Sequence, residues 1–276
     1  MVVNRSAWYP PSPMAEADAF REVAVAAARA AGALLRAHRG AARSVRAKSS
    51  PINLVTEVDR EAEALVVDAI RARFPGHAIL GEEGGAQGSS THRWIIDPLD
   101  GTTNFVHGLP LFSVSIGLEI AGRMAVGVVY DPSLDECFVA ERGAGAFLDG
   151  RRLAVSETTE LGASLLATGF PYDVRDTSDN NLAEYAAFTR QNRSVRELGS
   201  AAITLAAVAA GRLDGYWELV LGPWDVAAGL LLVEEAGGRV TDLRGGPLDL
   251  AAPRVVASNG RIHEAMLRTL ASVRGR

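Results

Sequence analysis

The chain has 276 residues, of which 48% are hydrophobic and 22% charged, with a formal net charge of −5 at pH 7. This composition excludes an intrinsically disordered protein, and the length predicts one large domain or two closely packed domains. The negative charge offers no general attraction to a nucleic acid, so we expect no such partner, and a phosphate-bearing substrate would need a local positive charge such as a bound cation.

The predicted elements follow a proline-rich N-terminal extension, residues 1–13, that lacks the apolar core of a signal peptide. Apolar residues recur at helical spacing over 15–38, and a short extended piece, 54–56, precedes a second helix at 57–74. No stretch reaches the ~18 apolar residues of a membrane span. One cysteine, Cys137, excludes an internal disulfide and fits a reducing compartment. Because a membrane span is also lacking, we expect a cytoplasmic protein without a membrane partner.

The middle of the chain predicts strands. Apolar runs at 78–80 and 94–96 are separated by a polar loop, and an antiparallel meander with a hairpin turn at Asp149 and Gly150 follows. The strands of this meander are predicted at 112–120, 124–130, 136–141, 146–148 and 152–155.

Beyond residue 160 strands and helices alternate, which is typical of an α/β unit. Strands are predicted at 164–168, 194–197, 215–218 and 254–257, and helices at 181–191, 201–211, 224–236 and 261–273. The chain is therefore interpreted as an α+β domain, 14–156, and an α/β domain, 157–276, with a ligand cleft between them.

Two carboxylates follow the apolar run at 94–96, in the segment Asp97, Pro98, Leu99, Asp100. The proline and the glycine that follows favour a turn over a continued strand, and a turn lets Asp97 and Asp100 converge. Converging carboxylates repel each other unless a cation joins them, and such oxygen ligands suit Mg2+, Mn2+ or Ca2+. An ordinary turn capped by Asp97 would explain the same spacing.

Further acidic residues follow other predicted elements. Glu82 comes after the strand that precedes this motif, Glu218 ends a later strand, and Asp225 begins the next helix. Each has an ordinary explanation by itself, such as a solvated loop for Glu82 or a helix cap for Asp225. Residues 101–105 could begin a helix whose free backbone amides bind an anion beside the carboxylates.

Three motifs occur in order: GEE at 81–83, WIIDPLDGTTNFVHG at 94–108 and WDVAAG at 224–229. With these motifs the chain resembles the inositol monophosphatase family from about residue 15 to the C-terminus. The resemblance implies a layered αβαβα sandwich of the α/β class that works as a homodimer. It also implies a Mg2+-dependent, lithium-sensitive phosphatase acting on a small-molecule phosphate ester.

The resemblance also implies roles for individual residues. Two or three Mg2+ ions, for which Mn2+ could substitute, would be held by Glu82, Asp97, the Leu99 carbonyl, Asp100 and Asp225, with Asp97 bridging. The implied catalytic residues are Glu82, Asp97 and Thr102. The implied substrate contacts are the amides of Gly101 and Thr102 for phosphate, and Glu218 with the backbone of Gly199, Ser200 and Ala201 for the alcohol.

The chain departs from the family pattern in the segment KSSPINLVTEVD. In the family, the threonine that matches Thr102 pairs with an aspartate of this segment, and here Asn53 occupies that position. An amide can orient a hydroxyl but cannot accept a proton. We expect an active enzyme in which the metal and Glu82 activate the water. Thr56 and Asp59 lie in the same segment.

The leading hypothesis is hydrolysis of a small polyol phosphate, foremost myo-inositol monophosphate, by a metal-activated water without a covalent intermediate. Glu218 favours a polyol, because a carboxylate binds neighbouring hydroxyls. Histidinol phosphate, fructose 1,6-bisphosphate, NADP and adenosine bisphosphate are alternative substrates. A non-catalytic protein that binds a metal and an anion to dock a partner is a further alternative, which only Asn53 favours.

Overall fold

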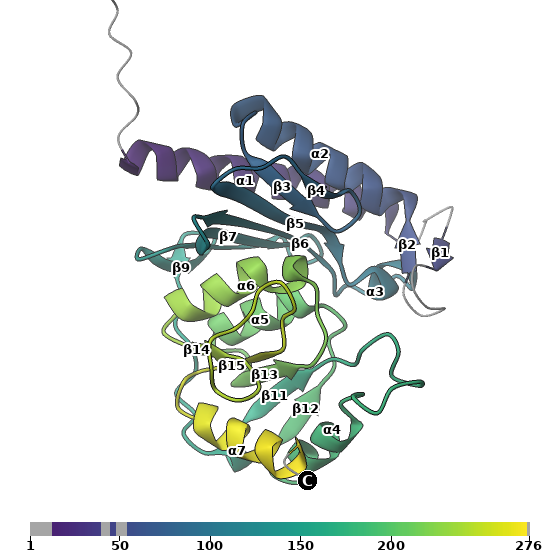
Figure 1. The fold of residues 1–276 in the computed structure, drawn as a ribbon, viewed down its shortest axis with the longest axis vertical. Helices are drawn as coiled ribbons and strands as arrows, with labels where there is room; N and C mark the ends of the chain where they lie inside the picture. The colour runs from purple at the N-terminus through teal and green to yellow at the C-terminus, as the bar shows by residue number, and fades with distance from the viewer. Residues whose placement is uncertain (1–12, 40–44, 48–53, 275–276) are drawn as a thin grey trace, which may run out of the picture.

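A computed structural model describes residues 13–39, 45–47 and 54–274 of the protein, and Asn53 lies outside them. Its elements form five layers, alternately helical and sheet-like (Figure 1). The helical layers are α1 (Pro13–His38) with α2 (Glu57–Arg73), then α5 (Ala201–Ala209) with α6 (Pro223–Glu235), and last α4 (Leu182–Thr189) with α7 (His263–Arg274). The αβαβα sandwich of the α/β class is confirmed.

The first sheet has eight strands in the order β10-β9-β8-β7-β6-β5-β3-β4, and only β3 and β5 pair in parallel. Its strands are β3 (Ala78–Gly81), β4 (Gly85–Gln87), β5 (His92–Asp100), β6 (Ser113–Ile120), β7 (Arg123–Asp131), β8 (Glu136–Glu141), β9 (Gly145–Leu148) and β10 (Arg151–Arg152). The predicted meander and its hairpin at Asp149 and Gly150 are confirmed, although the last strand is shorter than predicted.

The second sheet has five strands in the order β12-β11-β13-β15-β14, of which β12, β11 and β13 run parallel. Its strands are β11 (Leu165–Thr168), β12 (Ser194–Arg196), β13 (Gly215–Glu218), β14 (Arg239–Thr241) and β15 (Val255–Ser258). The remaining elements are β1 (Val45–Ala47), β2 (Leu54–Thr56), α3 (Thr102–Val106) and the 3-10 helix η1 (Leu161–Ala163). Sequence patterns missed β4 and β14, which are short strands with few apolar residues.

The structure corrects the prediction of a turn directly after residue 96. Strand β5 continues to Asp100, with Asp97 paired to Ser115 and Asp100 paired to Ser113. The register shifts between these two pairs, which marks a bulge around Pro98. A bulge accommodates a proline, which lacks a ladder donor, and re-aims neighbouring side chains while the strand goes on.

Three hydrophobic clusters hold the layers together, one under α1 and α2, one between the two sheets around α5 and α6, and one under α4 and α7. The middle cluster joins strands of both sheets, and α6 packs against β6 and β7 of the first sheet. Both helices of the central layer belong to residues 157–276 and pack against both sheets, and the domain boundary between 156 and 157 stays a prediction. No helix in the described ranges is long and apolar enough to span a membrane.

A buried histidine in the second half makes stability depend on pH. His263 is 0% exposed, and its ring nitrogens lie 2.8 Å from the Ser258 hydroxyl and 2.9 Å from the Thr241 hydroxyl. Burial lowers the pKa of His263 to about 4. The unfolded chain, with a histidine pKa of about 6.5, therefore binds a proton that the folded protein does not, and stability falls as the pH drops below about 6.5.

From about pH 7.5 to about pH 5, His263 is expected to remove about 2 kcal/mol of the free energy of unfolding. The variant His263→Gln lacks this titration. Urea unfolding of both proteins at the two pH values should show the difference in stability between wild type and His263→Gln shrinking by about 2 kcal/mol at the lower pH. An unchanged difference would contradict a neutral buried imidazole.

Candidate metal centre and substrate cleft

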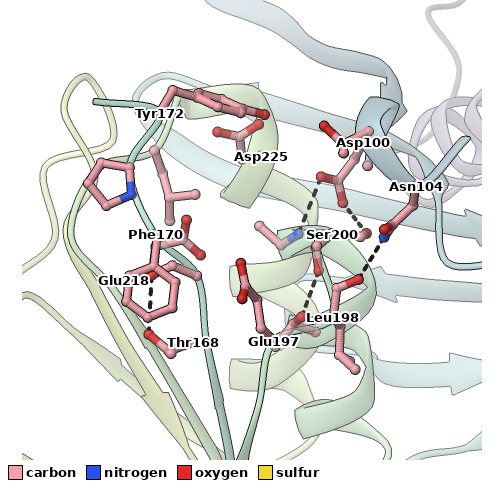
Figure 2. Close-up of a pocket in the computed structure, with 18 of the residues that line it drawn as sticks. Asp100, Asn104, Thr168, Phe170, Tyr172, Glu197, Leu198, Ser200, Glu218 and Asp225 are labelled. Atoms are coloured by element: carbon pink, nitrogen blue, oxygen red, sulfur yellow. Dashed lines mark hydrogen bonds between the residues drawn. The ribbon is translucent and has the colours of Figure 1, made fainter. Parts of the chain in front are cut away.

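Three aspartates from two elements meet where β5 ends. Asp97 and Asp100 come from the bulged end of β5, and Asp225 comes from the first turn of α6. One carboxylate oxygen of each lies within 4.8 Å of the other two. Figure 2 shows Asp100 and Asp225 on either side of one end of the cleft. The packing of α6 on the first sheet thus brings Asp225 to residues more than a hundred positions earlier.

The cluster is electrostatically strained without a cation. Burial raises the pKa of Asp97 well above its usual range, and the charges of Glu82, Asp100 and Asp225 raise it further. Burial and the charges of Asp100 and Glu82 raise the pKa of Asp225 to about 8. Carboxylate oxygens are the preferred ligands of hard divalent cations, and ligands at about 2.1 Å from one ion lie about 3 to 4 Å apart. The residues therefore fit a divalent cation.

Hydrogen bonds orient the three carboxylates. Asp97 accepts from the Leu99 amide at 3.0 Å, and Asp225 accepts from the Gly222 amide at 2.6 Å. Asp100 accepts from the Ala202 amide at 2.8 Å and also from the hydroxyls of Ser113 and Ser200. Asp100 therefore ties β5 to the start of α5, which was not evident from the sequence.

Glu82 lies beside the cluster on the loop after β3. Its amide donates to the Ile96 carbonyl at 3.1 Å, and its charge raises the pKa of Asp97, but among the described residues it is not within the 4.8 Å group. Glu63 holds this loop by accepting from the amides of Glu83 at 2.9 Å and Gly84 at 2.7 Å. Sequence reasoning missed Glu63. The feature that could have indicated its role is that a carboxylate stands on the buried, largely apolar face of α2.

Thr102 lies behind the cluster, and its hydroxyl contacts the carboxylate of Asp59, for which sequence reasoning predicted no such role. Its hydroxyl is 3.2 Å from Asp59 Oδ1 and 3.1 Å from the Leu99 carbonyl. Asp59 is 0% exposed and also accepts from the hydroxyl of Thr56 at 2.6 Å. Any contact of Asn53 lies outside the described residues. The spacing of Thr56 and Asp59 is that of a capping box. Because this local role explains Asp59 by itself, the sequence pattern offered no reason to expect its contact with Thr102.

The predicted helix after the motif is α3, which begins at Thr102 rather than Gly101. Gly101 has φ 93°, and a Cβ there would lie 2.8 Å from the Leu111 carbonyl oxygen and 3.1 Å from that of Gly199. Only glycine fits this conformation and this space. The backbones of Gly101 and Gly199, predicted from distant parts of the chain, therefore meet at the cleft.

A cleft of about 980 Å3 extends from the aspartates toward the second sheet. The predicted residues that line it are Glu82, Asp100, Gly101, Gly199, Ser200, Ala201, Glu218 and Asp225, whereas Asp97, Leu99 and Thr102 are buried behind its wall. Four large apolar side chains, each about half exposed, also line it, namely Leu109, Tyr172, Leu182 and Val220. Sequence reasoning missed these four, since Leu109, Tyr172 and Val220 lie in loops, which carry no periodic signal, and Leu182 is the first residue of α4.

Glu218 lies at the end of the cleft away from the aspartates. It accepts a hydrogen bond from the Tyr216 hydroxyl, and burial raises its pKa to about 8 with smaller contributions from the charges of Asp225 and Asp100. A carboxylate in this environment gains from donor groups of a bound molecule, which replace the water that it has lost.

Comparisons with known proteins agree with this geometry. The model of the inositol monophosphatase family matches residues 16–274. The chain is 48% identical over 253 residues to inositol-1-monophosphatase of Synechocystis sp., covering 91% of this chain and 88% of that protein. It is 46% identical to Nus factor SuhB of Pseudomonas aeruginosa, covering 90% and 94%. The solved structure of inositol monophosphatase from Anabaena (Nostoc) sp. superimposes with a TM-score of 0.86 at 47% identity, covering 94% and 97%.

Proposed function

This chain belongs to the inositol monophosphatase family and is a phosphatase, and on that premise we propose that it hydrolyses phosphate monoesters of small polyols, foremost myo-inositol monophosphate, with Mg2+. The observation that supports this proposal is the grouping of Asp97, Asp100 and Asp225 within 4.8 Å at one end of a cleft. The other end holds Glu218, which suits the hydroxyls of a polyol.

In this proposal Mg2+, or Mn2+ in its place, is held by Glu82, Asp97, the Leu99 carbonyl, Asp100 and Asp225. Bound cations stabilise negative charge on a phosphate and acidify water. The amides of Gly101 and Thr102 bind the phosphate, and Glu82 accepts a proton from the attacking water. Glu218 and the backbone of Gly199, Ser200 and Ala201 orient the alcohol.

Asn53 does not remove the carboxylate that Thr102 needs. The Asp59 carboxylate accepts from the Thr102 hydroxyl at 3.2 Å, so this hydroxyl has a buried anionic partner within the described residues. We therefore expect turnover by the natural sequence. Lithium sensitivity and a homodimer follow from the family resemblance, whereas a cytoplasmic location and the two-domain division follow from the sequence pattern; all four belong to the same proposal.

The proposal is tested by measuring phosphate release from a panel of esters after the protein has been freed of metal with a chelator. We expect no turnover of myo-inositol monophosphate until Mg2+ is added, and inhibition when Li+ is added with Mg2+. The panel includes histidinol phosphate, fructose 1,6-bisphosphate, NADP and adenosine bisphosphate. A folded protein that releases phosphate from no ester in Mg2+ would contradict the proposal.

One observation favours a second function. A relative with 46% identity carries the name Nus factor SuhB, not that of a phosphatase. A non-catalytic role in binding a partner would fit four half-exposed apolar side chains around the cleft. The predicted absence of a nucleic-acid partner therefore stays a prediction. A folded chain that binds Mg2+ but hydrolyses none of the panel would favour this alternative.

A further inference from the structure

A second glutamate faces the alcohol end of the cleft. Glu197 follows β12 directly, and Glu218 ends β13, so the two carboxylates come from the same edge of the parallel part of the second sheet. Figure 2 shows both side chains pointing into the lower part of the cleft from opposite sides. Neighbouring parallel strands deliver the residues after them to one edge, where ligands of such sheets bind.

We propose that Glu197 and Glu218 together determine specificity, so that the cleft selects monophosphates whose alcohol part is cationic or rich in hydroxyls and rejects esters with a second phosphate. This inference rests on the proposed phosphatase function and names the substrate class of the same site. Glu218 was predicted from the sequence as a substrate contact, whereas Glu197 was not.

The space between the two glutamates is kept open by a residue without a side chain. Strand β11 lies between β12 and β13, and Gly169 follows it directly. A Cβ on Gly169 would lie 2.3 Å from a carboxylate oxygen of Glu218, so a larger residue would displace that side chain. The three strand ends therefore form a floor with a carboxylate on each side.

In the part of the chain that the structure describes, no basic side chain balances the charges on this floor. No lysine, arginine or histidine of residues 13–39, 45–47 and 54–274 lines the cleft. Within the same ranges, the side chain of Glu197 makes no hydrogen bond or ion pair, and burial raises the pKa of its carboxyl. The charge of Glu197 also raises the pKa of Glu218, which indicates that the two groups interact.

These charges favour one kind of alcohol over another. Hydroxyl groups or an ammonium group of a substrate can donate to both carboxylates, which improves binding because the carboxylates are partly desolvated. Above about pH 8, where Glu218 is ionised as well, a second phosphate would face two like charges, and no basic side chain of the described residues lines the cleft to pair with it. Such juxtapositions exclude wrong ligands. The bisphosphates among the alternative substrates are therefore disfavoured.

The test compares matched esters. Glucosamine 6-phosphate and glucose 6-phosphate differ by an ammonium in place of a hydroxyl, and fructose 1,6-bisphosphate differs from fructose 6-phosphate by one phosphate. Values of kcat/KM are measured for the natural chain, Glu197→Gln and Glu218→Gln. The control is Glu157→Gln, whose side chain is 92% exposed and lies outside the cleft lining. For an ester that is not turned over, its Ki against myo-inositol monophosphate hydrolysis replaces kcat/KM.

We expect the natural chain to prefer the ammonium ester and to reject the bisphosphate. In Glu197→Gln, the ratio of kcat/KM for glucosamine 6-phosphate to that for glucose 6-phosphate should fall by about threefold to tenfold. The ratio for fructose 1,6-bisphosphate to fructose 6-phosphate should rise by a similar factor. Glu157→Gln should change neither ratio. Equal ratios in Glu197→Gln and the natural chain, with both proteins folded by circular dichroism, would overturn the inference. If the natural chain hydrolyses none of the esters, the proposed function fails, and direct binding of the same pairs still tests the selection.

Discussion

Replacing Asp225 by asparagine is expected to lower kcat/KM by at least about 1,000-fold while making the metal-free protein more stable. Asp225 is one of the three carboxylates that lie within 4.8 Å of one another, and an amide binds a divalent cation less strongly than a carboxylate. The side-chain oxygen of the introduced asparagine can still accept from the Gly222 amide, so the start of α6 should remain intact.

The gain in stability has an electrostatic cause. Burial, followed by the charges of Asp100 and Glu82, raises the pKa of Asp225 to about 8. The charged carboxylate is therefore unfavourable in the folded, metal-free protein above about pH 8, and Asp225→Asn should raise the free energy of unfolding there by about 1 to 3 kcal/mol. The gain should shrink toward about pH 5, where the aspartate is protonated in the folded protein.

The measurement pairs kinetics with urea unfolding in chelator. The control is Asp68→Asn, an exposed position on α2, which should change neither quantity. A variant that loses activity together with stability would indicate a folding defect instead of a lost ligand. A variant that keeps its activity would exclude Asp225 from the metal site.

Removing divalent cations is expected to make the protein less stable as the pH rises from about 6 to about 8. Burial raises the pKa of Asp97, Asp100 and Asp225. A raised pKa means that the folded protein holds protons that the unfolded chain has released. For Asp225, this contribution to stability is fully present below about pH 4 and is lost as the pH rises through about 8. A bound cation takes the place of these protons.

A Mg2+ concentration of about 100 times the dissociation constant at pH 8 should therefore raise the unfolding temperature by about 5 to 10 °C at pH 8. The same Mg2+ concentration should raise it by less at pH 6. Calorimetry with chelator or Mg2+ at the two pH values checks this difference. His263 does not interfere, because its effect at a given pH is the same in the chelator and Mg2+ samples that are compared. In Asp225→Asn the shift should be small at both values. Equal shifts at both pH values in the natural chain would contradict proton release by these aspartates.

The carboxylate motif was readable because its residues are neighbours. Asp97 and Asp100 follow an apolar run, and their spacing predicted convergence on a cation. The reason given for convergence was wrong, since β5 continues as a strand with a bulge. Local propensities of proline and glycine favour a turn, whereas pairing of Asp100 with Ser113 across the sheet decides in favour of the strand.

Contacts between distant segments could not be read in the same way. The Ser200 hydroxyl meets Asp100, and Thr102 meets Asp59, through the packing of elements that are far apart in the chain. Each of these side chains also fits a local role, as a helix cap or a turn residue, so the sequence pattern offers no reason to pair them. Glu197 is a similar case, because it belongs to a loop after a short strand.

The sequence by itself determined the α/β class, the main strands and helices, and the acidic motifs, because hydrophobic periodicity and short-range turn chemistry act between near neighbours. The tertiary structure decided which of those acids share a site. Asp225 joins Asp97 only because α6 packs on the first sheet, and Glu197 faces Glu218 only because β12 and β13 flank β11. Such juxtapositions depend on how whole layers pack, and burial then sets the pKa values that give the site its chemistry.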